Sequence, residues 1–336
     1  MALITTPLVR RLAFAIDCVD HPKGGRHIHT KETAFLGGLA VIVSMASVIA
    51  LYVVWGNFNI SVVPHRFMHG IAAGVLLLVV GGYLDDRYTL SAKFSFIFPA
   101  LSAAVVVGSG VGIGIDTLTN PFGGVVSLSG MFWGIPLSAV FVWCWIMGMT
   151  YTTKLLDGLD GLAAGVSLIG GLVMFALSLT ERIDQPVTAT LAIVFVGALA
   201  GYLVYAFHPA SIFLGEIGST FLGFFLAILA VLTGAKIATA VLVMGIPILD
   251  VAWAVLRRLL RGRSPFSADR EHLHFLLLDA GLSQRQVVYI FYILAAVFGF
   301  IAVFLQSTGK LIALGILLVV MVGLVGFMAS VYKKRS

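Results

Sequence analysis

The sequence predicts an all-α membrane protein, a polytopic bundle of about ten transmembrane helices with catalytic loops at one face. Three observations predict this class. Of the 336 residues, 60% are hydrophobic and only 11% are charged. The mean hydropathy of +1.07 exceeds what a soluble domain needs. The apolar residues also gather in runs long enough, or nearly long enough, to span a bilayer.

Ten such runs follow one another along the chain. No linker, low-complexity tract or internal repeat separates them, so residues 1–336 are expected to form a single integral membrane domain. The first sixteen residues are too short and too interrupted for a span, and they predict an interfacial helix. Residues 113–130 contain turn residues between β-prone runs and predict a small external hairpin. The expected spans are 34–55, 67–84, 94–113, 131–150, 159–180, 187–207, 217–234, 237–256, 287–306 and 310–331.

The basic residues predict how the bundle lies in the membrane. If residues 1–33 are cytoplasmic, 17 of the 21 Lys and Arg residues fall inside, because only Arg66, Arg182, Lys236 and Lys310 fall outside. The net charge of +6 is then a topology signal and does not indicate a nucleic-acid partner. We expect a multi-pass protein of the inner (plasma) membrane with its active site in the cytoplasm. The two cysteines are assigned to different environments, so no disulfide is expected.

An acidic pair closes one apolar run. Asp85 and Asp86 end it, and Lys93 follows in a segment rich in Ser and Thr. Such a pair can bind a metal or act as a base toward a phosphate nucleophile, while the lysine neutralises substrate charge. The alternative is a solvated helix end with stop-transfer charges.

Two further acidic motifs stand before apolar runs. In LLDGLDG, residues 155–161, Asp157 and Asp160 are spaced to share one side of a helical turn, and the glycines allow a bulky ligand to approach. In FLGEIGS, residues 213–219, Glu216 precedes a helix whose N-terminal amides suit an anion. For this motif the alternative is a simple helix cap formed by Glu216 and Ser219.

The most basic loop carries the run SPFSADREHLH at 264–274. His272 and His274 could hold zinc, but no cysteine or third nearby histidine completes a set. Binding of a diphosphate or nucleotide by Arg270 and the histidines is favoured instead, against a basic loop that only fixes topology. Asp250, near the end of the preceding run, is expected to help this loop fold back.

Taken in this order, the motifs resemble the polyprenyl-phosphate N-acetylhexosamine-1-phosphate transferases, which include WecA-type enzymes and phospho-MurNAc-pentapeptide transferases. The resemblance runs from about Asp20 to Gly281 and includes a first loop with Arg26 and His29. The run at 264–274 is closer to the WecA-like branch, which implies a small UDP-N-acetylhexosamine donor.

The resemblance implies transfer of a HexNAc 1-phosphate, with GlcNAc 1-phosphate expected, from a UDP-sugar to a polyprenyl phosphate. UMP is released, Mg²⁺ is the cofactor with Mn²⁺ as an alternative, and the reaction would be the first step of cell-envelope glycan synthesis. Membrane lipids are further partners, no nucleic acid is expected, and the choice between monomer and homodimer stays open. The motifs and the resemblance together give the expected site. The catalytic residues are Asp85, Asp86, Asp157 and Asp160, and the metal ligands are Asp157 and Glu216. The substrate-binding residues are Lys93, Lys154, Arg26, His29, Arg270, His272, His274 and Ser219.

The chain departs from the family pattern at metal-proximal positions. Tyr151 and Lys154 stand where the family has Asn-x-x-Asn, and Glu216 replaces an Asp. Phe275 replaces a frequent third histidine and Ala34 a loop proline. The family's first membrane helix has no counterpart, so the chain is expected to begin late or to dispense with it. Lys154 is therefore expected to supply part of the charge neutralisation while Glu216 holds one divalent ion; alternatively, Lys154 is only a marker of the inner side.

Two other function classes compete. One is a catalytically degenerate lipid-phosphate-binding or transport protein on the same bundle. Secondary transporters tend to show internal repeats and broken helices, and the sequence predicts neither. The other is a CDP-alcohol transferase, whose Asp-Gly motif would be spaced differently on one helix.

Overall fold

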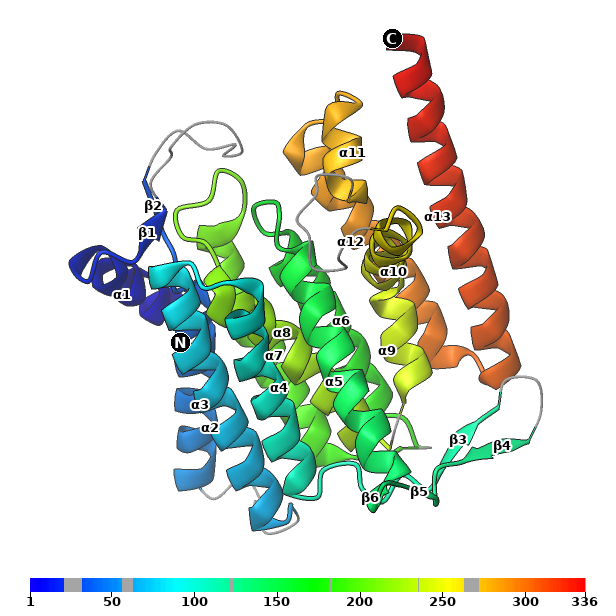
Figure 1. Ribbon diagram of the computed structural model, residues 1–336. Helices are drawn as coiled ribbons and strands as arrows, with labels where there is room; N and C mark the ends of the chain where they lie inside the picture. Colours follow the sequence, from blue (N-terminus) through cyan, green and yellow to red (C-terminus); the bar gives the residue numbers. More distant parts are fainter. Residues whose placement is uncertain are drawn as a thin grey trace.

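The computed structural model describes residues 1–20, 32–55, 63–120, 124–181, 183–234, 236–262 and 272–335. The described chain is mostly helical, and its long helices stand side by side in one bundle (Figure 1). This confirms the all-α class. The helices are α1 (Ala2–Ala15), α2 (Gly37–Val54), α3 (His65–Tyr88), α4 (Ala92–Gly108), α5 (Leu137–Leu156), α6 (Leu162–Ser178), α7 (Pro186–Ala206), α8 (Gly215–Leu232), α9 (Ile237–Val243), α10 (Gly245–Leu260), α11 (Leu273–Asp279), α12 (Gln284–Phe304) and α13 (Ser307–Arg335).

Six of the described helices are long and apolar enough to cross a membrane, namely α2, α3, α5, α7, α8 and α12. The bent pair α9–α10 would make a seventh span, and α4, α6 and the 308–324 part of α13 are shorter apolar helices. The expected runs fall mainly on these helices, although residues 131–136 of the run expected at 131–150 form two short strands and their turn. The count of ten remains a prediction. Large apolar side chains on the outer helices are exposed, such as Phe304 at 82% and Val319 at 71%. A lipid environment accounts for this surface better than water does.

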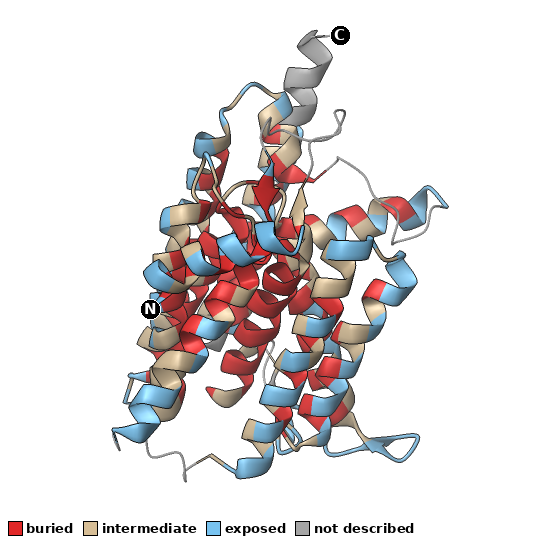
Figure 2. Cartoon of the chain, turned by 90° about the vertical axis from the view of Figure 1, so that its left-hand side faces the viewer, coloured by how far each residue is buried: buried red, intermediate tan, exposed pale blue. Residues whose placement is uncertain are grey.

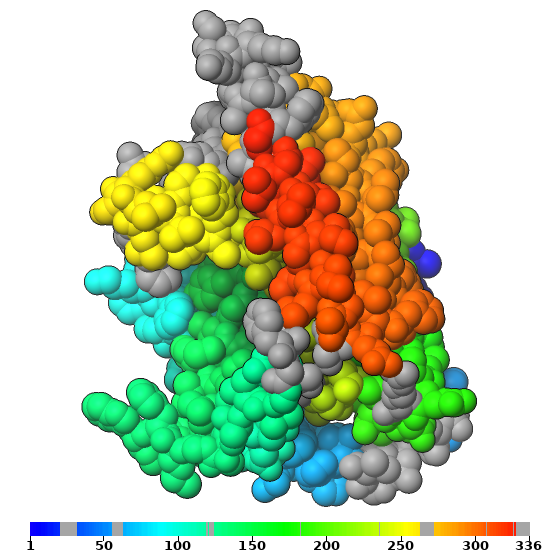
Figure 3. Space-filling view, turned by 90° about the vertical axis from the view of Figure 1, so that its right-hand side faces the viewer, coloured from blue at the N-terminus to red at the C-terminus, as the bar shows by residue number. Residues whose placement is uncertain are grey.

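The continuous span expected at 237–256 is wrong. Helices α9 and α10 meet at Met244 with a bend of 82°. Pro247 lies in the first turn of α10 and has no N–H to donate to the carbonyl of Val243, which removes a helical hydrogen bond at the bend. The prediction that the chain contains no broken helix is therefore also wrong. Helix α10 continues to Leu260 and stands out from the side of the molecule (Figure 3).

Helix α8 lies at the centre of the bundle. In its spanning window 89% of the residues are buried, and the buried residues concentrate in the middle of the molecule (Figure 2). Glycines allow this close packing: the backbone of Gly38 in α2 lies against Gly218, and the carbonyl of Met149 in α5 faces Gly223. The N-terminal turn of α8, which carries Glu216, is thus surrounded by other helices.

Three small antiparallel pairs flank the helices. They are β1 (Val19–Asp20) with β2 (Thr33–Ala34), β3 (Thr117–Thr119) with β4 (Val125–Ser127), and β5 (Met131–Phe132) with β6 (Ile135–Pro136). The β3–β4 pair confirms the predicted hairpin. It lies with β5–β6 at one end of the bundle, whereas β1–β2 and α11 lie at the other (Figure 1).

The N-terminal residues form helix α1, which packs on α2 and α7. The helix is as predicted, and its interfacial position stays a prediction. Cys18 is buried and Cys144 is exposed, and both are free thiols. Burial raises the pKa of the Cys18 thiol to about 11, so this thiol is poorly reactive.

Candidate active site

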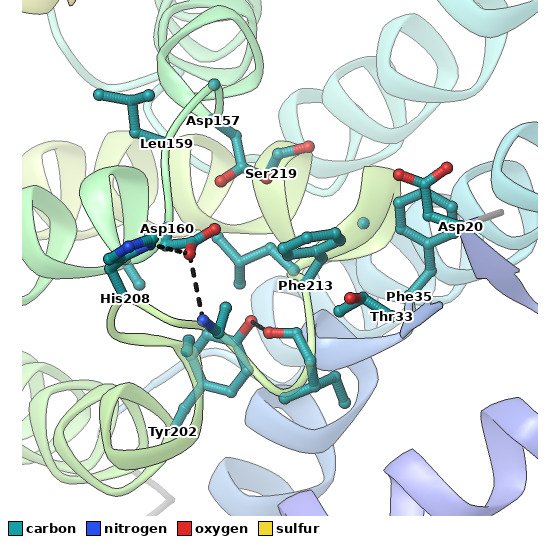
Figure 4. A pocket seen from close by; sticks show the side chains of 18 of the residues that line it. Asp20, Thr33, Phe35, Asp157, Leu159, Asp160, Tyr202, His208, Phe213 and Ser219 are labelled. Atoms are coloured by element: carbon teal, nitrogen blue, oxygen red, sulfur yellow. Dashed lines mark hydrogen bonds and ion pairs between the residues drawn. The ribbon is translucent and has the colours of Figure 1, made fainter. Parts of the chain in front are cut away.

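A cavity of about 620 Å³ lies at the end of the bundle that carries β1–β2. Its walls come from the α5–α6 loop, the α7–α8 loop, the first turn of α8 and β1–β2. Figure 4 shows side chains from these segments around it. The cavity brings together motifs that are far apart in the sequence, as predicted: Asp86, Lys154, Asp157, Asp160, Glu216 and Ser219 all line it.

Lys154 lies in an acidic cluster assembled from four helices. Its ammonium forms an ion pair with Glu216 of α8, donates to the hydroxyl of Ser95 of α4 at 2.7 Å, and lies 3.8 Å from a carboxylate oxygen of Asp85 of α3. Ser95 in turn donates to Asp85 at 2.7 Å. These side chains are largely buried, so the lysine is a fixed cation inside the site.

Lys154 lies three residues before Asp157 in the sequence, but its partners are Glu216 and Asp85. The reason is local. Helix α5 ends at Leu156, and Asp157 has ψ near 54°, outside the helical range. The expected helical turn at 157–161 is therefore replaced by a loop, because Gly158 and Gly161 interrupt the helix and Gly161 has a φ of +77°.

Asp86 caps the central helix from a neighbouring helix. Its two carboxylate oxygens accept the backbone N–H of Glu216 at 2.8 and 3.1 Å. The first amides of α8, which the sequence suggested for a substrate anion, therefore already face a protein carboxylate. Neither Glu216 nor Ser219 caps α8 with its side chain, because its N-cap residue is Leu214 and no side-chain cap bond is made there.

Gly215 makes this arrangement possible. Its φ is +67°, and a Cβ added there would lie 2.6 Å from an Asp86 oxygen. We expect Gly215→Ala to lower the free energy of unfolding by more than the roughly 1–2 kcal/mol of a left-handed alanine alone. Gly234→Ala is the matched control, since Gly234 has a φ of +77° but open space around its Cβ position. Thermal unfolding in detergent should rank Gly215→Ala clearly below Gly234→Ala, and equal midpoints would contradict the packing argument.

The two acids of the α5–α6 loop have different surroundings. Asp157 lines the cavity, and burial, with the nearby charges of Glu216 and Asp160, raises its pKa to about 8. Asp160 instead accepts the ring Nδ1–H of His208 at 2.7 Å and the backbone N–H of Ala210 at 3.1 Å (Figure 4). Asp160 thus holds the α7–α8 loop, while within the described chain no hydrogen bond occupies the Asp157 carboxylate.

The histidine segment folds back as predicted. Asp250 of α10 accepts the ring Nδ1–H of His272 at 2.9 Å and the backbone N–H of Leu273 at 2.8 Å, and so caps α11. His274 is fully buried, which lowers the pKa of its ring to about 4. A Cβ on Gly158 would meet its Nε2 at 2.5 Å, so the histidine packs directly behind the 157–161 loop.

Other predicted residues are not in the cavity or not described. Lys93 is exposed at the start of α4 and does not line the cavity. Asp85 does not line the cavity and instead lies beside Lys154, which does. The predictions for Arg26, His29 and Arg270 fall outside the described residues. The catalytic, metal-binding and substrate-binding roles assigned from sequence therefore stay predictions.

Two site residues were missed by sequence reasoning. Ser95 bridges Asp85 and Lys154, and its only signal was a place in a Ser-rich segment after the acidic pair. His208 lines the cavity beside Asp160. Its signal was a His-Pro pair just before the FLGEIGS motif.

The carboxylates fit a divalent cation that is shared with substrate. The described residues include no group of three or more His, Cys, Asp or Glu side chains placed to hold one ion. Mg²⁺, however, is usually held by one or two protein carboxylates together with substrate phosphates. Asp157 and Glu216 both supply oxygens to the cavity, and oxygen is the donor type that this ion prefers.

Comparisons with known proteins show the family to which the chain is similar. Residues 68–234 match the glycosyl transferase family 4. A probable undecaprenyl-phosphate N-acetylglucosaminyl 1-phosphate transferase of Bacillus subtilis is 34% identical over 95% of this chain and 86% of its own length. A decaprenyl-phosphate N-acetylglucosaminephosphotransferase of Mycobacterium tuberculosis is 31% identical over 89% of this chain and 79% of its own length. An undecaprenyl-phosphate alpha-N-acetylglucosaminyl 1-phosphate transferase of Escherichia coli is 28% identical over 88% of this chain and 78% of its own length.

The relatives extend over nearly the whole chain, and the family match contains Asp86, Lys154, Asp157, Asp160 and Glu216. The chain therefore belongs to glycosyl transferase family 4, in its WecA-like branch of membrane-embedded polyprenyl-phosphate sugar-1-phosphate transferases.

Proposed function

We propose that the protein transfers N-acetylglucosamine 1-phosphate from UDP-N-acetylglucosamine to a polyprenyl phosphate, as the first step of a cell-envelope glycan. The observation that carries this proposal is the cavity where Asp86, Lys154, Asp157 and Glu216 meet at one end of an apolar bundle. A lipid phosphate can enter such a site from the membrane while a nucleotide sugar enters from water. The names of the three relatives support the acceptor and the sugar.

In the proposed reaction an oxygen of the lipid phosphate attacks the β-phosphorus of the donor. A new P–O bond forms as the anhydride bond between the α- and β-phosphates breaks, and UMP leaves. One phosphoanhydride replaces another, so the protein's task is to position the reactants and stabilise charge. Asp86 is proposed to orient the lipid phosphate and take its remaining proton, while the fixed ammonium of Lys154 offsets part of the phosphate charge.

The lining of the cavity explains why a divalent cation is proposed. Among the described residues, Asp20, Asp86, Asp157, Asp160 and Glu216 line it, and the basic lining residues are Lys154 and His208. Such a surface would repel two phosphate substrates. Mg²⁺, or Mn²⁺ in its place, would be held by Asp157 and Glu216 and would supply the missing positive charge.

Activity can be tested directly with purified protein, polyprenyl phosphate, Mg²⁺ or Mn²⁺, and a panel of UDP-sugars. We expect UMP release that requires the lipid and is fastest with UDP-N-acetylglucosamine. A folded protein that releases no UMP with any sugar would favour the degenerate lipid-binding or transport alternative. If UMP release is fastest with another UDP-sugar, the proposed donor is wrong but the proposed reaction type stands.

We further propose that the cavity faces the cytoplasm of a plasma membrane. Tyr88, 65% exposed, follows the acidic pair at the cavity end, and Met131, 76% exposed, lies beside the hairpin at the other end. In a background with Cys144→Ser, cysteine at position 88 should be protected from an impermeant thiol reagent in intact cells, and cysteine at 131 should be labelled. The reverse pattern would contradict the orientation.

A further inference from the structure

His208 is held in one orientation at the cavity wall. Its Nδ1 lies 2.7 Å from Asp160 Oδ2. A carboxylate oxygen only accepts hydrogen bonds, so Nδ1 carries a proton, and Nε2 is a donor as well when the ring is the imidazolium. The same oxygen accepts the N–H of Ala210 at 3.1 Å, which fixes the carboxylate in turn (Figure 4).

The backbone of His208 is held by a separate contact. Arg285 of α12 donates from Nε and Nη2 to the His208 carbonyl at 3.2 and 2.9 Å. One anchor therefore acts on the ring and another on the main chain, which restricts both the loop and the side-chain rotamer. Of the two ring nitrogens, Nε2 makes no hydrogen bond within the part of the chain that the structure describes. The side chain is 40% exposed and lines the cavity.

We infer that His208 is a substrate-binding residue which, as the imidazolium, donates from Nε2 to a phosphate oxygen of the bound nucleotide, with Asp160 as its positioning residue. Within the described lining the basic side chains are His208 and Lys154, and Lys154 is already bound to Glu216 and Ser95. His208 is thus the lining donor that keeps a nitrogen available for a phosphate, and a charged donor to phosphate makes a strong hydrogen bond. The inference rests on the proposed nucleotide-sugar donor and adds the residue that binds its phosphate.

Two substitutions separate binding from a purely structural role. The amide nitrogen of asparagine can take the place of Nδ1 and keep the bond to Asp160, but it does not reach the cavity. The amide nitrogen of glutamine can take the place of Nε2. We expect His208→Asn to lower kcat/KM by about a hundredfold and His208→Gln by only about tenfold, with both variants folded by thermal unfolding in detergent. A His208 that served only to anchor the loop would give the opposite order.

The binding step can be measured without turnover by comparing UMP and uridine in calorimetry. His208→Asn should weaken the binding of UMP by about tenfold and leave the binding of uridine unchanged, because only UMP carries the phosphate. An Asn variant that binds UMP like the wild type, or equal losses of activity in both variants, would overturn the inference while wild-type activity stands. If the wild type binds neither UMP nor UDP-N-acetylglucosamine, the proposed function itself fails.

Discussion

Asp86→Asn should reduce UMP release by at least about a hundredfold while leaving the protein folded. Asparagine keeps an acceptor oxygen for the N–H of Glu216, so the capping contact at 2.8 Å can persist. The substitution removes the negative charge, the basicity and the second contact at 3.1 Å. Losses of this size are usual for a general base or a metal-anchoring acid. Asp85→Asn should be impaired similarly, because Asp85 accepts from Ser95 and faces Lys154.

The matched control is Asp17→Asn. Asp17 forms an exposed ion pair with Arg87 at 2.9 Å, near the same end of α3 but outside the cavity lining. Exposed pairs contribute little to stability, so this variant should retain activity within about twofold. Near-normal turnover of both Asp85→Asn and Asp86→Asn would leave the acidic pair as a topology signal only.

Lys154→Ala should be badly impaired in both activity and stability. The alanine leaves the Glu216 carboxylate without its ammonium partner in a site where both side chains are about one-fifth exposed. The loss of unfolding free energy should be larger than the roughly 1 kcal/mol that an exposed ion pair contributes. It should be smaller than the roughly 3–5 kcal/mol that is lost when a fully buried pair is broken. The double variant Lys154→Met with Glu216→Gln removes both charges and should recover thermal stability without recovering activity.

The metal dependence separates the roles of the two partners. Lys154→Asn should be partly active with an altered Mg²⁺ requirement, because the neutral amide removes a fixed cation that the divalent ion then has to replace. Glu216→Gln should be nearly inactive, since it removes a proposed ligand charge. UMP release measured against Mg²⁺ concentration decides the matter. If Lys154→Ala keeps full activity and the wild-type Mg²⁺ curve, the charge-replacement idea is wrong.

Much of the fold could be predicted because apolar length and charge placement are local properties of the sequence. Most of the expected runs coincide with helices, and the turn residues predicted the hairpin at β3–β4. The bend between α9 and α10 was not predicted, because hydropathy continues across Met244 and the effect of Pro247 on one hydrogen bond does not alter it. Neither could the sequence show that α8 is the buried centre, since its mean hydropathy of 1.9 lies inside the range of the other spans, 1.2 to 2.7.

The residues of the site were more predictable than their partners. The acids at 86, 157 and 216 were found because each stands beside an apolar run with glycines nearby. Their contacts depend on tertiary packing. Glu216 pairs with Lys154, which is 62 positions away, and not through a cap within its own helix. Asp160 serves a loop histidine that no local pattern linked to it.

The most direct test of the account is to follow the β-phosphate of the donor. UDP-N-acetylglucosamine carrying ³²P at the β-position is incubated with the wild-type protein, polyprenyl phosphate and Mg²⁺, and the lipid and aqueous products are separated. The account predicts that the label moves into the lipid fraction as polyprenyl diphosphate N-acetylglucosamine, with unlabelled UMP released in equal amount. Label recovered in UDP would mean that the sugar alone is transferred, and label left entirely in the donor would mean no reaction; either result would contradict the account.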